Sequence, residues 1–286
     1  MKRKGEAPFF EGWYWKQQSP EQTLALIVAH HAAKNAPETA TLQVLTEKSS
    51  LVLPLPPLRV GAGCVCCDAG AFGPAGLRLS VESAQGRISG TLIFTDPTPP
   101  RCDIMGPFAL MPAMECRHKL CSLRHRVDGE LNFNGTRYRF ESAAGYAEGD
   151  RGISFPSRYL WTQGFFGAQS QNSVMLSVAE VPLGNLRFPG TIAGIWLDGK
   201  EYRLATYLGA RVVWADRNGA KITQGSDSLE VRMLGGERRS LQAPISGGMH
   251  RTVREGLCCR VFYRFVHHGQ IKLQCICENA SFEGEW

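Results

Sequence analysis

The chain consists largely of short segments in which apolar and polar residues alternate. Alternation is clearest over residues 136–140 and 202–206, and a period of two places every second side chain on the same face of an extended strand. The spacing of apolar residues typical of a helix is scarce, with short candidates at 19–22 and 74–76. The pattern predicts an all-β protein of the sandwich or barrel class. Further strands are predicted at residues 23–29, 40–47, 59–65, 77–83 and 87–95.

Turn signals separate these segments at short intervals. Asn-Gly, Asp-Gly and similar pairs supply the positive φ angles that tight hairpin turns require. Prolines at 54–57 and 96–100 interrupt the strands, because proline cannot donate a hydrogen bond into a central ladder. The sequence therefore predicts short antiparallel strands joined by hairpins. The tetrapeptides that predict these hairpins lie at 127–130, 133–136, 197–200, 217–220 and 267–270.

Length and charge limit the number of domains and the kinds of partner that are expected. A chain of 286 residues can bury a large core and is expected to divide into two domains. The boundary that suits both the length and the turn pattern gives domains 1–144 and 145–286. The net charge is +6, but most basic residues are scattered along alternating strands. No nucleic-acid-binding motif accompanies them, so a solvated basic surface is the preferred interpretation and no nucleic-acid partner is expected.

The N-terminus and the cysteines bear on the cellular compartment. The N-terminus is basic but lacks the apolar region of a secretory signal, and no apolar stretch approaches the roughly 20 residues of a membrane-spanning helix. A cytoplasmic protein is therefore expected. The ten cysteines occur as CxCC, CC and CxC or singly, and not as the CxxC pair typical of structural zinc. They are interpreted as reduced thiols, and neither a metal nor a cofactor is expected.

Acids and aromatic residues are most concentrated between residues 145 and 166. Tyr146, Glu148 and Asp150 alternate, so a strand here presents a phenol and two carboxyls on one face and Arg151 on the other. Glycines on both sides of the Asp-Arg pair loosen the backbone, which favours a bulge or a close backbone approach. A surface strand with two solvated acids is the plain alternative, since any half-buried strand alternates.

A second strand follows the turn predicted at Phe155-Pro156. Its residues Tyr159, Trp161 and Gln163 again share one face. The plain interpretation is a buried aromatic strand. The functional interpretation adds these side chains to the wall of a pocket that also contains the acids.

Two other segments place an acid beside aromatic or imidazole side chains. Glu11 shares a strand face with Trp13 and other aromatic residues, which fits either a solvent-facing acid or a pocket wall. In the segment 114–125, a regular strand puts Glu115 and His125 on one face and His118 on the other. A polar outer face explains this second segment equally well.

The segment from Gly145 to Gln163 resembles the signature of the tocopherol cyclase-like family, whose usual pattern is G-Y-[IA]-E-K-D-W-G-x-S-F-P-x-x-[WY]-[IL]-W-x-Q. It departs from this pattern at Gly149 and Arg151, where the family has Lys and Trp. The resemblance runs through nearly the whole chain in the same order. The further blocks that support it are Phe9–Trp15, Met105–His125 and Gly190–Val212.

This resemblance implies two lipocalin-like antiparallel β-barrel or curled-sheet domains packed together, the second beginning near residue 145. Barrels of about eight strands can hold one small ligand. The family cyclises a phytyl-substituted benzoquinol to a chromanol without a cofactor. The sequence has no Gly-rich phosphate loop, GxSxG or HExxH motif. It therefore gives no support to a nucleotide-binding protein, a serine hydrolase or a zinc protease.

Cyclisation of this kind needs a proton for an alkene, an apolar site for the resulting cation and a group that orients the attacking phenol. A carboxylic acid kept protonated by burial can supply the proton, and aromatic faces attract the cation. With the resemblance, Asp150 is the first choice as proton donor, followed by Glu148 and Glu115. The residues predicted to line the substrate site are Tyr146, Tyr159, Trp161, Trp13, Gln163, His118, Glu11 and Arg151.

Arg151 tests this assignment, because a cation beside Asp150 would hold that carboxyl ionised unless it points to the opposite strand face. Strand alternation favours the opposite face.

Two alternatives stay open: a non-catalytic lipocalin-like binder of a hydrophobic small molecule, and a related hydratase of a long-chain isoprenoid. The expected partner is a hydrophobic prenylated small molecule, with peripheral membrane contact as one way to collect it. The sequence does not fix the oligomeric state.

Overall fold

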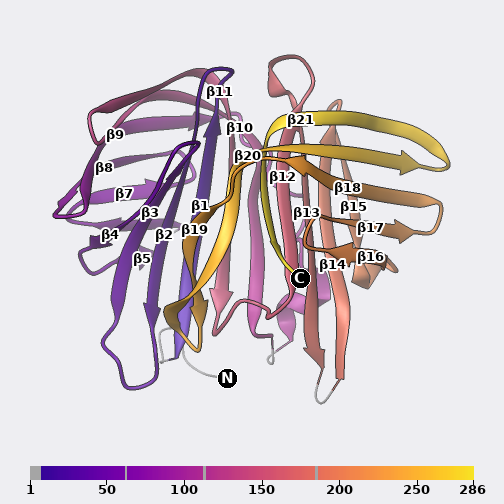
Figure 1. Cartoon of the computed structure of the whole chain (residues 1–286), viewed down its shortest axis with the longest axis horizontal. Coiled ribbons are helices and arrows are strands. Elements are labelled where there is room, and N and C mark those ends of the chain that lie inside the picture. The colour runs from indigo at the N-terminus through magenta and orange to yellow at the C-terminus, as the bar shows by residue number, and fades with distance from the viewer. Residues whose placement is uncertain (1–7, 62, 112–113, 184–185) are drawn as a thin grey trace.

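The computed structural model describes residues 8–61, 63–111, 114–183 and 186–286. Almost every described segment is a strand, which confirms the predicted all-β class. The strands form two antiparallel sheets that lie side by side (Figure 1). The first sheet contains β1 (Phe9–Gln18), β2 (Thr23–Ala32), β3 (Thr39–Thr46), β4 (Ser50–Leu55), β5 (Arg59–Gly61), β6 (Cys64–Cys67), β7 (Gly70–Gly73), β8 (Gly76–Ser83), β9 (Gly86–Thr95), β10 (Cys116–Phe133) and β11 (Thr136–Gly152).

The second sheet is formed by the remaining strands, and short 3-10 helices lie in some of the connections. The helices are η1 (Gly106–Leu110), η2 (Ala168–Ser170) and η3 (Thr206–Leu208). The strands are β12 (Tyr159–Phe166), β13 (Asn172–Leu183), β14 (Leu186–Leu197), β15 (Lys200–Ala205), β16 (Arg211–Asp216), β17 (Gly219–Gln224), β18 (Asp227–Gly235), β19 (Arg239–Ile245), β20 (Gly248–His267) and β21 (Gln270–Glu285).

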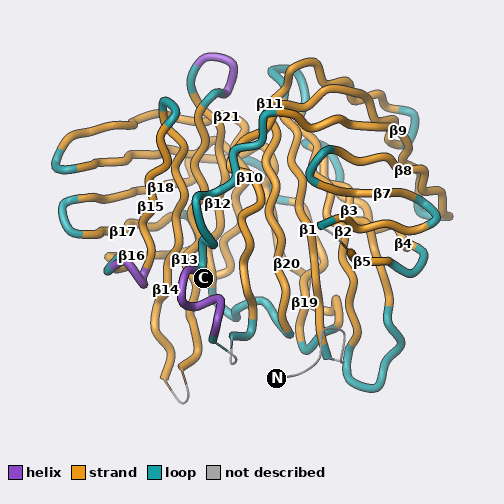
Figure 2. The backbone as a smooth tube through the Cα atoms, turned by 180° about the vertical axis from the view of Figure 1, so that it is seen from behind, coloured by secondary structure: helices purple, strands orange, loops and turns teal. Residues whose placement is uncertain are grey.

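Both sheets follow the same plan. The first has the order β4-β3-β2-β1-β11-β10-β9-β8-β7-β6-β5, and the second the order β15-β14-β13-β12-β21-β20-β18-β17-β16 with β19 paired to β20. In each, the chain runs outward from the first strand, crosses to the far edge and returns until the last strand pairs with the first. Contacts of β4 with β8 and β9, and of β14 with β16, show that each sheet curls on itself (Figure 2).

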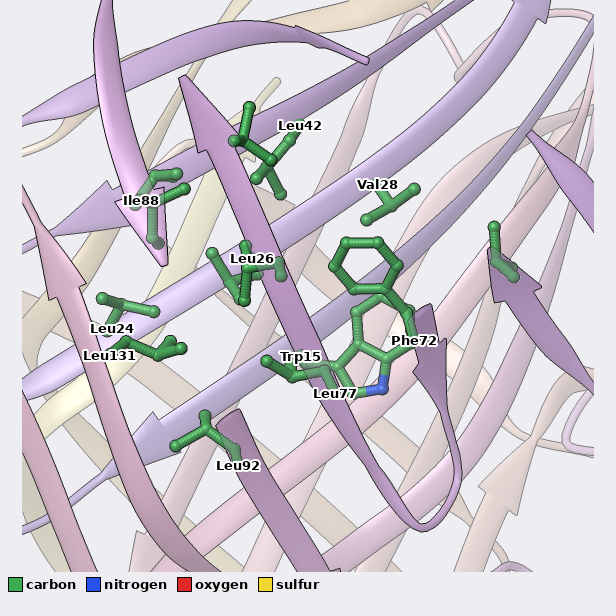
Figure 3. Packing of buried hydrophobic residues seen from close by; sticks show 14 of the residues in the cluster. Trp15, Leu24, Leu26, Val28, Leu42, Phe72, Leu77, Ile88, Leu92 and Leu131 are labelled. Atoms are coloured by element: carbon green, nitrogen blue, oxygen red, sulfur yellow. The ribbon is translucent and has the colours of Figure 1, made fainter. Parts of the chain in front are cut away.

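Strand alternation divides the buried side chains between the inside of each curl and the seam between the sheets. Leu26 and Phe72 belong to the cluster inside the first sheet (Figure 3), and Phe265 belongs to the cluster inside the second. Tyr14 and Trp161 belong to a cluster contributed by both sheets. Because a buried side chain of this size stabilises the fold by about 1.5–3 kcal/mol, all three regions hold the molecule together.

The chain passes from the first sheet to the second between residues 153 and 158. β11 pairs with β1 without interruption from Ala144 to Gly152, and β12 begins at Tyr159. The segment from Tyr146 to Gly152 therefore closes the first sheet, where the sequence interpretation had it open the second. As a boundary between folding units, the division into 1–144 and 145–286 stays a prediction.

Most of the predicted hairpin turns occur, but one is wrong. The turns at 133–136, 197–200, 217–220 and 267–270 each join two paired strands. At 127–130 the chain continues as β10, with a shift of register at Gly129. Gly129 has φ +130, and a Cβ there would lie 2.3 Å from the carbonyl oxygen of Thr91. The Asp-Gly pair therefore forms a bulge within a long strand and not a hairpin turn.

The two helical candidates are also wrong. Residues 19–22 and 74–76 lie in or beside turns between strands, because each is too short to bury an apolar face as a helix. Among the residues with described structure, no helix is long and apolar enough to cross a membrane. The cytoplasmic location stays a prediction.

Candidate functional site

A cavity of about 190 Å³ with a mainly apolar lining lies between the two sheets. Strands β1, β2, β3, β10 and β11 contribute residues from the first sheet, and β12, β13, β14, β19, β20 and β21 contribute residues from the second. The strands most central to each sheet thus meet at this cavity. Figure 1 shows them running side by side down the middle of the molecule.

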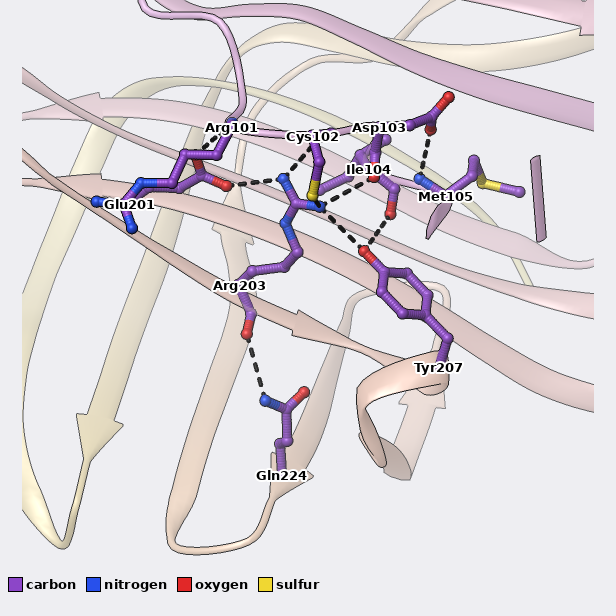
Figure 4. A network of polar contacts seen from close by, with 9 residues as sticks. All are labelled: Arg101, Cys102, Asp103, Ile104, Met105, Glu201, Arg203, Tyr207 and Gln224. Carbon is purple, nitrogen blue, oxygen red and sulfur yellow. Dashed lines mark hydrogen bonds and ion pairs between the residues drawn. The ribbon is translucent and has the colours of Figure 1, made fainter. Parts of the chain in front are cut away.

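The loop between β9 and β10 covers part of the cavity and is tied to the second sheet. Arg203 on β15 donates hydrogen bonds of 2.9 Å to the backbone carbonyls of Cys102 and Asp103 (Figure 4). Met105 and Phe108, a few residues further along this loop, line the cavity. The guanidinium has a rigid fork of donors, and these two hydrogen bonds tie the segment at Cys102 and Asp103 to β15.

An imidazole and two carboxyls meet at one wall of the cavity. His118 on β10 lies opposite Asp150 on β11 in the strand register. Its Nδ1 is 3.1 Å from Oδ1 of Asp150, and its Nε2 makes a longer ion-pair contact of 3.4 Å with Oε2 of Glu148. Burial alone would lower the pKa of His118, but the carboxylates of Glu148 and Asp150 outweigh it and raise that pKa to about 9. The imidazole is therefore a cation at neutral pH.

Glu148 is the most enclosed member of this group, with 6% of its surface exposed. The phenol of Tyr146 donates a hydrogen bond to its Oε2, and the indole Nε1 of Trp161 donates another of 3.1 Å to the same oxygen. Desolvation raises the pKa of Glu148 to about 7, although the nearby His118 and both hydrogen bonds favour the ionised form. At neutral pH this carboxyl is therefore protonated in a large fraction of molecules.

Glu255 and Glu283, which the sequence analysis did not select, line the same cavity. They face each other across β20 and β21, and both are buried. The phenol of Tyr14 donates a hydrogen bond of 2.7 Å to Glu255, and the phenol of Tyr159 donates one to Glu283. Desolvation, together with repulsion from Glu283, raises the pKa of Glu255 to about 8, and desolvation raises the pKa of Glu283 to about 7.

A weak signal for these acids is present in the sequence. The dipeptide Glu-Gly occurs at 11–12, 148–149, 255–256 and 283–284, and the last three of these glutamates line the cavity between the sheets. Alternation alone could not identify the second sheet's pair, because the strand register and sheet packing that bring 255 and 283 to residue 148 are not local properties.

Aromatic rings surround the acids. Tyr14 and Trp161 have ring centroids 5.4 Å apart, and Tyr146 and Trp161 are 6.4 Å apart. Phe155 packs edge-on against Tyr159 at 5.9 Å. Aromatic faces attract a cation by about 0.5–2 kcal/mol each. The arrangement can therefore stabilise positive charge beside the acids.

The structure gathers many of the predicted site residues at this cavity. Its lining includes Trp13, His118, Glu148, Asp150, Tyr159 and Trp161, and Tyr146 lies fully buried behind Glu148. The predicted alternation of Tyr146, Glu148 and Asp150 agrees with these contacts. Arg151 is exposed and does not line this cavity; it lines a second one, which Glu148 and Asp150 also border.

Other predicted residues lie elsewhere. Gln163 is fully buried and its side-chain amide lies 3.5 Å from Ser173, away from the cavity lining. The backbone carbonyl of Glu115 accepts a hydrogen bond from Ile153, and Glu115 lines neither cavity. The reason is that β10 begins at Cys116, so Glu115 sits at the end of the strand.

A second cavity, of about 790 Å³, also borders Glu148 and Asp150. Glu11 and Arg151 line it, as do Trp13 and Trp15, while Trp13, His118, Glu148 and Asp150 line both cavities. Strand alternation accounts for part of this division. On β1, Phe10 and Tyr14 line only the first cavity, whereas Glu11 and Trp15 line only the second.

Two groups of side chains could hold a metal ion among the described residues. One is His118, Glu148 and Asp150, and the other is Asp227, His267 and His268 near the β20–β21 hairpin; in each, the ligand atoms lie within 4.8 Å of one another. One imidazole with two carboxylates, or two imidazoles with one carboxylate, are donor sets that divalent metals accept. The absence of a metal and of a cofactor therefore stays a prediction.

The sequence matches the tocopherol cyclase-like family over residues 85–285. A protein from Oryza sativa subsp. japonica named "Probable tocopherol cyclase, chloroplastic" is 27% identical over 141 residues, which cover 47% of this chain and 30% of the rice protein. "Tocopherol cyclase, chloroplastic" from Zea mays is 26% identical over 113 residues, which cover 38% of this chain and 24% of the maize protein. The matched regions thus span less than a third of these relatives.

Solved structures agree with the fold. Kievitone hydratase from Nectria haematococca has a TM-score of 0.54 at 10% sequence identity, with 97% of this chain and 89% of that chain covered. A protein from Nitrosomonas europaea with the provisional assignment AttH has a TM-score of 0.54 at 15% identity, covering 96% and 92%. At such identities the likeness concerns the fold alone. Because the family match covers well over half of the sequence, the chain belongs to the tocopherol cyclase-like family.

Proposed function

We propose that this protein is a cofactor-independent enzyme that protonates an alkene of a prenylated benzoquinol and closes a chromanol ring. The observation that carries the proposal is Glu148, a buried carboxyl with a pKa near 7 in the wall of a mainly apolar cavity. A general acid works best when its pKa lies near the working pH. Family membership and the plant relatives support the same class of reaction.

In this proposal Glu148, rather than Asp150, delivers the proton. Asp150 forms an ion pair with His118, which is protonated at neutral pH. That contact suits Asp150 to positioning the imidazolium. His118 in turn lies 3.4 Å from Glu148, where its charge stabilises the carboxylate that remains after the proton has left.

The surrounding rings would stabilise the cation that protonation creates. Trp161 and Tyr14 line the cavity with their rings 5.4 Å apart, and the largely apolar lining would keep water from the cation. Loss of water strengthens each electrostatic contact within the site. A related hydratase would use the same first step and capture the cation with water, which makes it the nearest alternative.

The test is to incubate the purified protein in D₂O with a prenylated hydroquinone and to determine product mass and structure. A cyclase gives a chromanol isomeric with the substrate and carrying deuterium at the protonated carbon. Addition of the mass of one water molecule instead identifies the hydratase. If the ligand binds but its mass and spectrum never change across a panel of prenyl chain lengths, the proposal is wrong and the protein is a binder of hydrophobic small molecules.

A further inference from the structure

The second sheet contributes its own pair of buried acids to the cavity. Glu255 has 2% of its surface exposed and Glu283 has 7%, and the two residues are direct neighbours across β20 and β21. Burial of two adjacent carboxyls is costly unless each is hydrogen-bonded and at least one keeps a proton. A pair of this kind is suited to taking up and releasing a proton.

Phenolic hydroxyl groups hold both carboxyls in place. Tyr14 donates to Glu255 at 2.7 Å and also lies 3.1 Å from the hydroxyl of Ser281. Tyr159 donates to Glu283. Both acids nevertheless line the cavity, so their surroundings fix the side chains without closing them off from a ligand.

The two sheets present their acids in the same way. Ala147-Glu148-Gly149-Asp150 on β11 corresponds to Phe282-Glu283-Gly284-Glu285 on β21, and β11 and β21 hold the same place in their sheets. Glu148 lies opposite Tyr14 in the strand register, and Glu283 lies opposite Trp161. One cavity therefore receives an acid centre from each sheet.

An aromatic pair connects these centres. Trp161 donates to Glu148 at 3.1 Å, Tyr14 donates to Glu255 at 2.7 Å, and the two rings are 5.4 Å apart. A cation held against these rings would thus lie near an acid on either side. One acid can give a proton to the alkene while the other receives one from the group that captures the cation.

We propose that Glu255 and Glu283 are the base of the reaction and recognise the hydroxyl group that attacks the cation. This rests on the proposed function. The O–H bond of Glu148 breaks as a C–H bond forms on one alkene carbon, and the ligand's hydroxyl oxygen then bonds to the other carbon. Its O–H bond breaks, the proton passes to the carboxylate of the pair, and the product is an isomer of the substrate. Exchange with solvent returns the proton to Glu148.

The substrate must therefore carry a hydroxyl group and an alkene close enough together to reach both acid centres. A phenol with an adjacent prenyl chain meets this requirement. The charged and titratable groups that face the pair are Tyr14 and Lys16 from β1, Glu148 and Asp150 from β11, Tyr159 from β12, Arg251 from β20 and Glu285 from β21.

The first test separates proton donation from capture of the hydroxyl group. The double variant Glu255→Gln, Glu283→Gln is assayed in D₂O with a prenylated hydroquinone. Ring closure should slow by about 10²–10⁴, while deuterium continues to appear in the recovered alkene, because protonation by Glu148 becomes reversible. Glu148→Gln should slow both by about 10²–10⁴. The exposed residue Glu278 on β21 pairs with Arg260, so Glu278→Gln, which removes the same charge, should change neither.

Two outcomes of this test contradict the proposal. Ring closure at the parent rate in the double variant would remove the pair from the reaction. If the double variant lost both deuterium exchange into the alkene and ring closure, the pair would belong to the proton-donating step. Thermal melting of each variant verifies folding, and the single variants Glu255→Gln and Glu283→Gln are used if the double variant does not fold.

A second test needs no turnover. Binding of a hydroquinone with a saturated chain is compared with binding of its dimethyl ether, by tryptophan fluorescence between pH 6 and 8.5. The parent should bind the hydroquinone roughly tenfold more tightly at the higher pH, since an ionised carboxyl accepts the stronger hydrogen bond. The affinity of the parent for the ether should not rise with pH. The affinity of the double variant for either ligand should not rise with pH. Equal pH profiles for parent and variant would overturn the inference, whereas the expected profiles without any turnover would contradict only the proposed function.

Discussion

Glu148 gathers three polar contacts on one oxygen, from Tyr146, Trp161 and His118. All three contacts lower the pKa of Glu148, but the effect of burial is larger and raises that pKa to about 7. The balance matters because an acid that is too strongly stabilised as a carboxylate has no proton to give, and one that is too weak cannot protonate an alkene. The residue therefore combines proton availability at neutral pH with stabilisation of its product state.

The pH dependence of proton transfer follows from this balance. Because the protonated form of Glu148 is the reactive one, the single-turnover rate of deuterium transfer to the alkene should fall as pH rises through about 7. A profile of this rate between pH 6 and 9, measured under saturating substrate, checks this. A rate that rises steadily across the range would indicate that the proton comes from a group other than this carboxyl.

Local sequence predicted part of the site and could not predict the rest. Tyr146, Glu148 and Asp150 were identifiable because alternation on one strand fixes their common face. Glu255 and Glu283 were not, since each is separated from Glu148 by a long stretch of chain and reaches it only through the packing of two sheets. Local pattern also could not show that Gln163 turns away from the cavity.

At the scale of the strands, glycines allow close backbone approach at the end of β11. A Cβ at Gly152 would lie 2.0 Å from the carbonyl oxygen of Glu115, which itself accepts the backbone N–H of Ile153. This contact fixes where the chain leaves the first sheet. The sequence predicted several strands and most of the named hairpins, but the strand predicted at 59–65 is two short strands, β5 and β6. The long β10 with its bulge at Gly129 depends on neighbours in the sheet.

Gly152→Ala should therefore destabilise the protein by roughly 1–3 kcal/mol, the usual cost of forcing extra atoms into a packed region. Gly61→Ala is the control, because nothing lies within 4 Å of a Cβ at that strand position, and it should change stability by less than about 0.5 kcal/mol. Urea unfolding of both variants measures the difference. Equal midpoints would mean that the close contact at Gly152 relaxes at no cost.

The molecule as a whole buries an unusual set of titratable groups at the seam between its sheets. Glu148, Glu255 and Glu283 have pKa values raised to about 7, 8 and 7, and His118 has one raised to about 9. A pKa raised by folding means that the folded state holds its proton more tightly than the unfolded chain. The corresponding stability is present at low pH and is lost as pH rises through the folded-state pKa.

The free energy of unfolding should therefore fall by an amount on the order of a few kcal/mol between pH 6.5 and 8. This window lies above the range in which two buried histidines oppose the effect: burial lowers the pKa of His125 to about 3 and also lowers that of His31. It lies below the range of Lys16, whose pKa burial lowers to about 8 and which acts from that pH upward. Melting temperatures across the window test this, and Glu255→Gln should flatten the dependence. A melting temperature that rises from pH 6.5 to 8 would contradict the buried, protonated state of these acids.

The central claim is that the buried carboxyl of Glu148 gives its proton to an alkene. The most direct measurement is the single-turnover rate of deuterium transfer from D₂O-equilibrated enzyme to a prenylated hydroquinone, for the parent, Glu148→Gln and Asp150→Asn, with folding verified by melting. Glu148→Gln should lose about 10²–10⁴ in rate, and Asp150→Asn should lose less because His118 keeps its contact with Glu148. Transfer at the parent rate in Glu148→Gln, with Asp150→Asn inactive, would contradict the account and make Asp150 the acid.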